Sequence, residues 1–255
     1  MSAPVFLAEA STAHPLSGYA AGSVYVLDGA EGRHAGVVQR RGPGERIDVV
    51  DGAGVRLRTV VESVDGAEVH LRVEQVDVEP VPAVVVTLVQ ALAKGDRDEM
   101  AIEAATEIGA DAIIPWQADR SVVVWRGDRA AKSRARWVST VRAATKQARR
   151  CRIPDVETPL STKQLAARTR EVVAAGGTVA VLHEEAATAL ATVPLPETGE
   201  LLVVVGPEGG ISETEVAQLT DAGAVTARLG PHVLRTSTAG PVAVALLSDR
   251  LGRWS

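Results

Sequence analysis

The sequence is poor in cysteine and in aromatic residues: Cys151 is the only cysteine among 255 residues, and Phe, Trp and Tyr together make up 3%. A single cysteine excludes a disulfide framework and a cysteine-rich zinc site. The chain does not open with a basic segment followed by an apolar one, so it carries no mark for secretion. Its apolar runs fall short of the roughly 20 residues needed to span a bilayer. We therefore expect a cytoplasmic protein without membrane association.

Hydrophobic residues are abundant, at 46% of the chain, which is typical of a packed globular core. The net charge is −5, yet between residues 120 and 152 eleven lysine and arginine side chains stand against one acid, Asp128. Charge runs of this kind are usually solvated helix faces. A patch of one sign on a body of the opposite sign also favours the docking of phosphates, and the count of eleven to one favours this second interpretation.

The first 75 residues or so lack a long helical period and favour a β structure. Three Asp-Gly pairs, at residues 28–29, 51–52 and 65–66, separate short β-rich runs. Because glycine accepts the positive φ that tight turns require, each pair indicates a hairpin. We expect a small β-barrel or sandwich that ends in a stiff, proline-containing linker at residues 79–82. The expected strands are Ser23 to Leu27, Ile47 to Val50, Val55 to Val61 and Glu68 to Val73.

After the linker, apolar runs alternate with helical patterns, which predicts an α/β domain with a mostly parallel sheet. The first run, Ala83 to Gln90, is typical of a strand buried on both faces. The expected later strands are residues 111–115, 178–182, 201–205 and 225–229, and the expected helices include 98–108, capped by Gly109, and 129–150. On the longer helix Trp137, Val141, Ala144 and Ala148 share one face, and Arg142, Lys146, Arg149 and Arg150 share another.

Two loops near the carboxyl end carry most of the functional signal. The first contains Gly206-Pro207-Glu208-Gly209-Gly210 and the second runs from Leu229 to Gly240. Strand-to-helix loops of neighbouring parallel strands lie side by side at one edge of a sheet, where α/β proteins bind ligands. Ser212 and Glu215 form a capping box that starts the next helix, and Thr238 can cap the last one. By itself the first loop is more typical of an ordinary turn, since it is neither a Rossmann fingerprint nor a P-loop.

Taken together, the two loops resemble the RsmE family of ribosomal RNA methyltransferases, which belong to the SPOUT superfamily of knotted, S-adenosylmethionine-dependent enzymes. Further matches extend the likeness over nearly the whole chain. They are Arg33-His34, Ile47 to Gly52, Lys94-Gly95-Asp96, Ala105 to Gly109, Arg120 to Val123, Trp137, Gln147 and Arg150.

The resemblance implies an α/β fold with a deep trefoil knot in its C-terminal, mostly parallel sheet and a small PUA-like β-barrel at the N-terminus. The implied domains are 1–78, which binds RNA, and 83–255, the SPOUT methyltransferase domain. The implied activity is methylation of uridine N3 in small-subunit (16S) ribosomal RNA, with S-adenosylmethionine as the methyl donor and without a metal. A homodimer is implied as well, and the substrate is either free RNA or the assembled small subunit.

Carried over to this chain, the resemblance assigns site residues from both loops and from the basic stretch. The residues expected to hold the methyl donor are Leu182, Gly206, Pro207, Gly209, Leu229, Gly230, Leu234 and Thr236. The residues expected to bind RNA are Arg33, His34, Arg120, Arg142, Gln147, Arg149 and Arg150.

The chemistry of the implied reaction singles out Arg235. Uridine N3 is a poor nucleophile until its proton leaves, so the enzyme must stabilise the uridine anion, and Arg235 is the candidate for that role. Pairing with Glu208 or with a helix end is the more modest explanation of this arginine. The proton acceptor is open among His232, Glu208 and water. His232 is equally well explained as an exposed loop residue.

The sequence departs from the family pattern at three positions, and two other functions stay open. Most relatives have Glu where this chain has Ser237, Lys where it has Ala104, and Glu where it has Lys146. A mechanism that depends on the first of these glutamates is therefore not expected here. One alternative is a knotted enzyme that methylates ribose 2′-hydroxyls; the Arg-Thr-Ser-Thr-Ala signature at 235–239 and the attached barrel argue against it. The other is a non-catalytic RNA-binding protein that retained the fold, which Ser237 makes conceivable.

Overall fold

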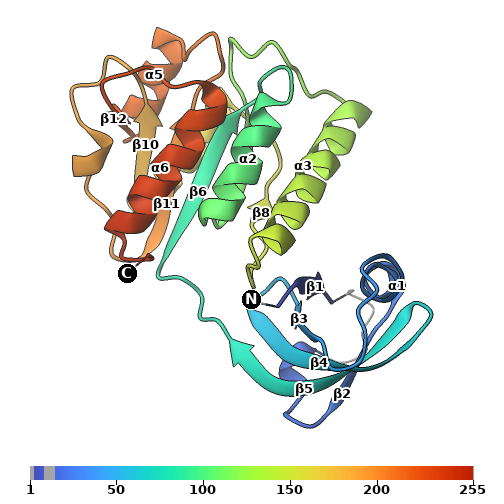
Figure 1. Cartoon of the computed structure of the whole chain (residues 1–255). Coiled ribbons are helices and arrows are strands. Elements are labelled where there is room, and N and C mark those ends of the chain that lie inside the picture. Colours follow the sequence, from blue (N-terminus) through green and yellow to red (C-terminus); the bar gives the residue numbers. More distant parts are fainter. Residues whose placement is uncertain (1–2, 9–14, 255) are drawn as a thin grey trace. The chain divides into compact units, whose positions relative to one another are not determined.

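The computed structural model describes residues 3–8 and 15–254, and the chain forms two compact units. The N-terminal unit comprises Met1–Val81 with Thr145–Ile153, and the C-terminal unit comprises Pro82–Ala144 with Pro154–Ser255. The predicted boundaries at 78 and 83 lie near the first point at which the chain passes from one unit to the other. Each unit is built around its own sheet (Figure 1).

The N-terminal unit contains a curled sheet with the strand order β1-β3-β4-β5-β2, in which the long strands β4 and β5 bend along their length (Figure 1). Two of the predicted hairpins are confirmed: β3 pairs with β4 and β4 pairs with β5, both antiparallel, around Asp51-Gly52 and Asp65-Gly66. Apolar side chains, among them Phe6, Tyr25 and Ile47, fill its core. The strands are β1 (Val5–Leu7), β2 (Val24–Leu27), β3 (Arg46–Val50), β4 (Val55–Asp65) and β5 (Glu68–Val78).

The third predicted hairpin, at Asp28-Gly29, is wrong. Gly29 has a positive φ of 60° but begins a helical segment, α1 (Gly29–Arg33) followed by the π-helical turn η2 (His34–Val38). The segment packs closely against the turn between β4 and β5 and against the end of β2, because a Cβ at Gly32 would lie 2.2 Å from the carbonyl oxygen of Ala67 and 2.4 Å from that of Leu27. Strand β2 pairs with β5 instead of β3, so the chain must cross the sheet here. A local turn signal could not reveal that long-range choice.

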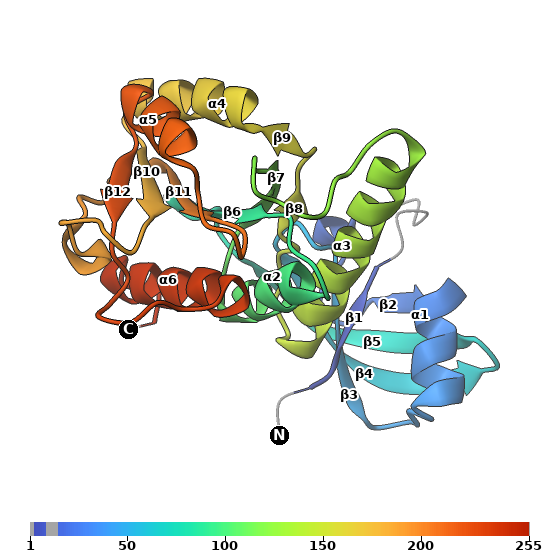
Figure 2. The same cartoon turned by 90° about the horizontal axis from the view of Figure 1, so that it is seen from above.

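The C-terminal unit contains a sheet whose pairings are parallel, in the order β12-β10-β11-β6-β7-β8, with β9 beside β7. Helices α2 and α6 cover one face of it, and α4 and α5 cover the other (Figure 2). The predicted α/β fold class of the SPOUT type is confirmed. The strands are β6 (Val84–Ala91), β7 (Ala112–Gln117), β8 (Asp155–Val156), β9 (Leu160–Ser161), β10 (Thr178–Leu182), β11 (Gly199–Val205) and β12 (Val225–Ala227). The helices are α2 (Arg97–Ile108), α3 (Asp128–Gln147), α4 (Thr162–Ala174), α5 (Glu213–Asp221) and α6 (Thr236–Arg250), and short 3₁₀ turns lie at Leu16–Gly18 and Leu190–Thr192.

Helix α3 ends three residues earlier than predicted, because Arg149 adopts the left-handed conformation with φ 56°. The backbone N–H of Arg149 donates to the Lys146 carbonyl, and that of Arg150 donates to the Thr145 carbonyl. This pair of bonds is the Schellman pattern that closes helix C-termini, usually with glycine at the left-handed position. The predicted apolar face is confirmed, since Trp137 and Val141 are fully buried.

Helix α6 begins two residues before the predicted cap, Thr238. Arg235 is its N-cap residue, and the Arg235 carbonyl accepts the N–H groups of Thr238 and Ala239. The predicted capping box at Ser212 and Glu215 is confirmed at the start of α5. None of the helices in the described residues is long and apolar enough to cross a membrane.

Candidate functional site

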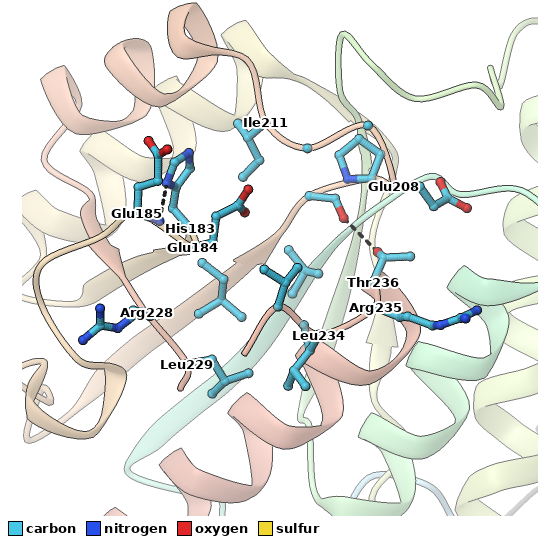
Figure 3. Close-up of a pocket in the computed structure, with 18 of the residues that line it drawn as sticks. His183, Glu184, Glu185, Glu208, Ile211, Arg228, Leu229, Leu234, Arg235 and Thr236 are labelled. Atoms are coloured by element: carbon cyan, nitrogen blue, oxygen red, sulfur yellow. Dashed lines mark hydrogen bonds between the residues drawn. The ribbon is translucent and has the colours of Figure 1, made fainter. Parts of the chain in front are cut away.

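The carboxyl ends of β10, β11 and β12 meet at one edge of the C-terminal sheet, and their loops enclose a cavity of about 880 Å³ (Figure 3). The parallel pairing of β10 with both neighbours forces this meeting, because all three strands end on the same side. Three segments line the cavity: residues 182–185 at the end of β10, residues 205–211 and 213 at the end of β11, and residues 228–236 after β12. Arg97, Arg120 and Ala239 complete the lining. The sequence therefore predicted correctly that the two C-terminal loops lie side by side.

A direct hydrogen bond joins the two loops. The Thr236 hydroxyl donates to the carbonyl oxygen of Gly206 over 2.8 Å (Figure 3). Thr236 is the first residue of α6 and is only 6% exposed, so water does not compete for this bond. The start of the last helix and the start of the glycine-rich loop are thus fixed to each other.

The glycine-rich loop turns tightly for steric reasons. A Cβ at Gly206 would lie 2.6 Å from Cγ1 of Ile211, so only glycine fits at this position. Gly210 has a positive φ of 74°, and its N–H donates to the Pro207 carbonyl over 2.9 Å. The loop leads into α5, whose capping residue Glu215 is fully buried. A side-chain-free backbone and an apolar Ile211 therefore face the cavity from this side.

Glu208 is held by groups of its own unit. Its Oε1 accepts from the Arg97 guanidinium over 2.9 Å and from the Lys94 backbone N–H over 3.3 Å. Burial opposes its ionisation, but hydrogen bonds from its own backbone N–H, from Arg97 and from Lys94 together lower the pKa of Glu208. A carboxylate with a lowered pKa is a weak proton acceptor. The contacts favour an anchoring role for Glu208 between the loop and α2.

Arg235 and His232 lie at the rim of the cavity and are both exposed. Within the described part of the chain the Arg235 guanidinium has no ion pair, so the expected pairing with Glu208 does not form. In Figure 3, Arg235 and Glu208 lie on one side of the cavity, with Leu229 and Leu234 between them and the opposite side. A cation without a protein partner is thus available to an anionic ligand at this rim.

The sequence prediction did not include the polar residues on the opposite side of the cavity. His183, Glu184 and Glu185 follow β10 directly, and Arg228 follows β12 (Figure 3). The Glu185 N–H donates to Nδ1 of His183 over 3.2 Å, which shapes the turn. Their position directly after a predicted strand, at the edge of the sheet where ligands bind, could have indicated them. The same reasoning that selected the loops after β11 and β12 holds for β10.

The predicted donor-binding residues all line this cavity. They are Leu182, Gly206, Pro207, Gly209, Leu229, Gly230, Leu234 and Thr236. The predicted catalytic residues Arg235, His232 and Glu208 line it as well. Their predicted roles remain predictions, because lining a cavity does not by itself assign chemistry.

The predicted RNA-binding residues are divided between the two units. Arg120 lines the cavity, where its guanidinium donates to the Gly209 carbonyl over 3.0 Å. Arg142 is exposed on the part of α3 that belongs to the C-terminal unit. The others, Arg33, His34, Gln147, Arg149 and Arg150, belong to the N-terminal unit. Among these, His34 already bonds to Gln39 over 2.8 Å and packs edge-on against Phe6, so its local structure accounts for it.

Half of the basic stretch is occupied by contacts within the protein. Arg134 donates to the carbonyls of Val156 and Glu157, Arg136 pairs with Glu99, and Lys146 contacts Glu31 over 2.7 and 2.8 Å. Arg120 and Arg152 also donate to backbone carbonyls. The exposed cations of the stretch for which the described residues provide no side-chain partner are Arg126, Arg129, Lys132, Arg142 and Arg149. The charges of these five are therefore not paired with a carboxylate in the part of the chain that the structure describes.

Comparison with known proteins gives the site its context. Residues 80–248 match the model of a family described as an RNA methyltransferase domain. The chain is 50% identical over 233 residues to the ribosomal RNA small subunit methyltransferase E of Mycobacterium bovis, covering 91% of this chain and 89% of the relative. The chain belongs to the RNA methyltransferase family.

Other RNA methyltransferases agree in sequence and in structure. The ribosomal RNA small subunit methyltransferase E of Bacillus subtilis is 34% identical over 228 residues, which cover 88% of this chain and 89% of that protein. A crystal structure of the enzyme of that name from Neisseria gonorrhoeae, bound to S-adenosyl methionine, is 26% identical; the match covers 98% of both chains with a TM-score of 0.82. The predicted family is therefore confirmed over nearly the whole length of this RNA methyltransferase.

Proposed function

We propose that this protein transfers a methyl group from S-adenosylmethionine to N3 of a uridine in small-subunit ribosomal RNA. One observation carries the proposal. This chain is 50% identical, over 91% of its length, to a ribosomal RNA small subunit methyltransferase E. Its predicted donor-binding residues all line one cavity at the carboxyl edge of a parallel sheet.

The cavity fits the methyl donor in size and in chemistry. Its volume of about 880 Å³ falls in the range of small-molecule sites, about 300–1,000 Å³. Leu182, Leu229 and Leu234 offer an apolar surface to a purine and its ribose, and the residues of the glycine-rich loop offer backbone groups. The bound donor would supply an electrophilic methyl group on its sulfonium. The protein itself must orient the two reactants and provide for the removal of the proton from uridine N3.

Arg235 is suited to stabilise the uridine anion. It caps α6 next to Thr236, whose bond to Gly206 fixes the position of its backbone, and its guanidinium is not consumed by an ion pair among the described residues. Of the proposed proton acceptors, Glu208 is disfavoured by its lowered pKa and its bond to Arg97. We therefore assign the proton to His232, which lines the same rim, or to water.

RNA would be held by the exposed cations of the basic stretch, with Arg142 and Arg149 as members of the predicted set. The N-terminal unit, residues 1–78 in the predicted division, would add contacts through Arg33.

We further propose a homodimer through the face that carries α2 and α6. Its support is the exposed apolar side chains there: Met100 is 58% exposed and Val242 is 41% exposed.

The decisive experiment is nucleoside mass analysis of small-subunit RNA after incubation with the purified protein and S-adenosylmethionine. We expect N3-methyluridine from the wild type. Arg235→Ala should retain donor binding in calorimetry and lose product by about 100-fold or more, as for removal of one group that stabilises developing charge. A ribose-methylated product would assign the protein to 2′-O chemistry instead. RNA bound without donor binding would indicate a pure binding protein.

A further inference from the structure

A buried glutamine supports the cavity without lining it. Gln90 lies in β6, a strand of otherwise mostly apolar residues inside the C-terminal sheet, and its side chain is 0% exposed. Its Nε2 donates to the Thr236 hydroxyl over 2.9 Å and to the Ala91 carbonyl over 3.1 Å. Burying an amide is costly unless it is fully hydrogen-bonded. Within the described residues, Oε1 of Gln90 has no partner, so this side chain is not the most stable choice for the core.

The hydroxyl of Thr236 has its hydrogen-bonding direction fixed by its neighbours. A hydroxyl has one proton to donate and two lone pairs to accept with. The proton goes to the Gly206 carbonyl, so the group on the other side must be a donor, and Nε2 of Gln90 supplies it. Thr236 therefore has no proton left for a ligand in the cavity. Its side chain acts as a link between the strand and the glycine-rich loop.

The link joins segments that are far apart in the chain. Residues 90 and 236 are 146 positions apart, and residues 206 and 236 are 30 apart. The start of α6 is also pressed against β6, since a Cβ at Gly240 would lie 3.0 Å from Leu88 Cδ1 and 3.4 Å from Gln90 Oε1. Gln90 is thus connected, through Thr236, to the start of the glycine-rich loop and to the end of the loop that follows β12.

We propose that Gln90 is a positioning residue for the donor site and acts through a relay from Gln90 to Thr236 to Gly206. The inference rests on the proposed function for the identity of the ligand. The relay keeps the Gly206 carbonyl, at the start of the glycine-rich loop, at a constant distance from the first turn of α6. That separation determines the width of the cavity between Gly206 and Leu234, and it fixes the backbone from which Arg235 projects.

The test uses Gln90→Met, which keeps side-chain length but cannot donate a hydrogen bond. Because the orphan Oε1 disappears with the amide, we expect the melting temperature to stay equal or to rise. Amide exchange of residues 206–211 and 236–240, measured by mass spectrometry on the protein without ligand, should become about five- to tenfold faster, the size of one net hydrogen bond. The dissociation constant for S-adenosylmethionine in calorimetry should rise by a similar factor.

Four further variants make the result specific. Thr236→Val should reproduce the effect and Thr236→Ser should not, because serine keeps the hydroxyl. The double variant Gln90→Met/Thr236→Val should be no worse than Thr236→Val alone, as for groups that act as a unit. Thr59→Val removes a buried hydroxyl that donates to Ile47 in the N-terminal unit, and it should leave donor affinity and exchange of both cavity segments unchanged.

Wild-type exchange rates in both segments of Gln90→Met would overturn the relay, as would strictly additive effects in the double variant. Should Gln90→Met fail to fold, the contrast between Thr236→Val and Thr236→Ser decides the same question. A wild type that binds no S-adenosylmethionine would refute the proposed function, while the exchange measurements would still decide whether the relay exists.

Discussion

Replacing Glu215 removes a carboxylate that is fully buried and joins three segments of the C-terminal unit. One oxygen accepts the Asp119 N–H and the Thr162 hydroxyl, both over 2.8 Å; the other accepts the N–H and the hydroxyl of Ser212, both over 3.0 Å. Asp119 follows β7, Thr162 is the first residue of α4, and Ser212 is the N-cap of α5. The carboxylate thus holds together the starts of two helices and a loop.

The expected loss of unfolding free energy follows from the number of donors that are left without an acceptor. In Glu215→Gln the amide oxygen can still accept from Asp119 and Thr162, but the amide nitrogen meets the Ser212 N–H, a second donor. One unsatisfied buried donor costs about 1–3 kcal/mol. In Glu215→Ala the donors at all three segments lose their acceptor, and we expect a loss of about 3–5 kcal/mol, at the upper end for single substitutions. At about 2–4 °C per kcal/mol, the melting temperature should fall by roughly 5 °C for Gln and 10–15 °C for Ala.

Urea unfolding followed by tryptophan fluorescence measures these losses. Trp116 donates from Nε1 to the Thr162 hydroxyl over 3.2 Å, so an indole lies beside the network and reports on it. Glu171→Gln, on the exposed side of α4, is the matched control and should stay within about 0.5 kcal/mol of the wild type. An unfolding free energy of Glu215→Gln equal to that of the control would refute the reasoning, because the Ser212 donor would then have found another partner.

Three further predictions follow from the described contacts. Arg149→Gly should raise the unfolding free energy by about 0.5–1 kcal/mol, because the left-handed strain of about 1–2 kcal/mol exceeds the entropic cost of glycine. A loss of stability would contradict the strain argument. The same variant should weaken RNA binding in a salt titration. Burial, reinforced by Glu79, raises the pKa of Cys151 to about 11, so alkylation of the folded protein at pH 8 should be about 200-fold slower than for a free thiol, whose pKa is about 8.5. Burial raises the pKa of the Asp98 carboxyl group, so the stability that its protonated form provides is present below about pH 3.9 and is lost as pH rises through the pKa of the folded state. Asp98→Asn does not titrate, so it should remove this part of the pH dependence of the unfolding free energy; an unchanged pH dependence would refute this.

Elements with strong local signals were predictable. The strand Thr178–Leu182 was predicted at its observed bounds, and the capping box of Ser212 and Glu215 starts α5 as expected. Both signals are local in the sequence: the strand is a continuous run of mostly apolar residues, and the two capping residues are three positions apart. The errors at Asp28-Gly29 and Thr238 share a different cause. There the local pattern allowed two structures, and a contact distant in sequence selected one: Ala67 beside Gly32 in the first case, and Gly206 beside Thr236 in the second.

The candidate site shows the same division. The family motif supplied the loop residues, and the parallel pairing of β10, β11 and β12 brings them around one cavity. Within the basic stretch, Arg134, Arg136 and Lys146 contact partners that are distant in sequence, which no local pattern could show. His183 and Glu184 were not predicted, although Leu182, which directly precedes them at the end of β10, was assigned to the site.

The sequence alone determined the alternation of strands and helices, the family, and the residues of the two loops, because hydrophobic period and motif spacing are local properties of the chain. Only the tertiary structure decided that Gln90 in a buried strand donates to Thr236 and that Glu215 joins three segments. It also decided that Glu208 pairs with Arg97, while Arg235 has no ion pair within the described residues. Those outcomes depend on which donor meets which acceptor across 30 to 146 residues. A buried polar group must take the partner that the packed chain brings to it, and its own sequence neighbours do not encode that partner.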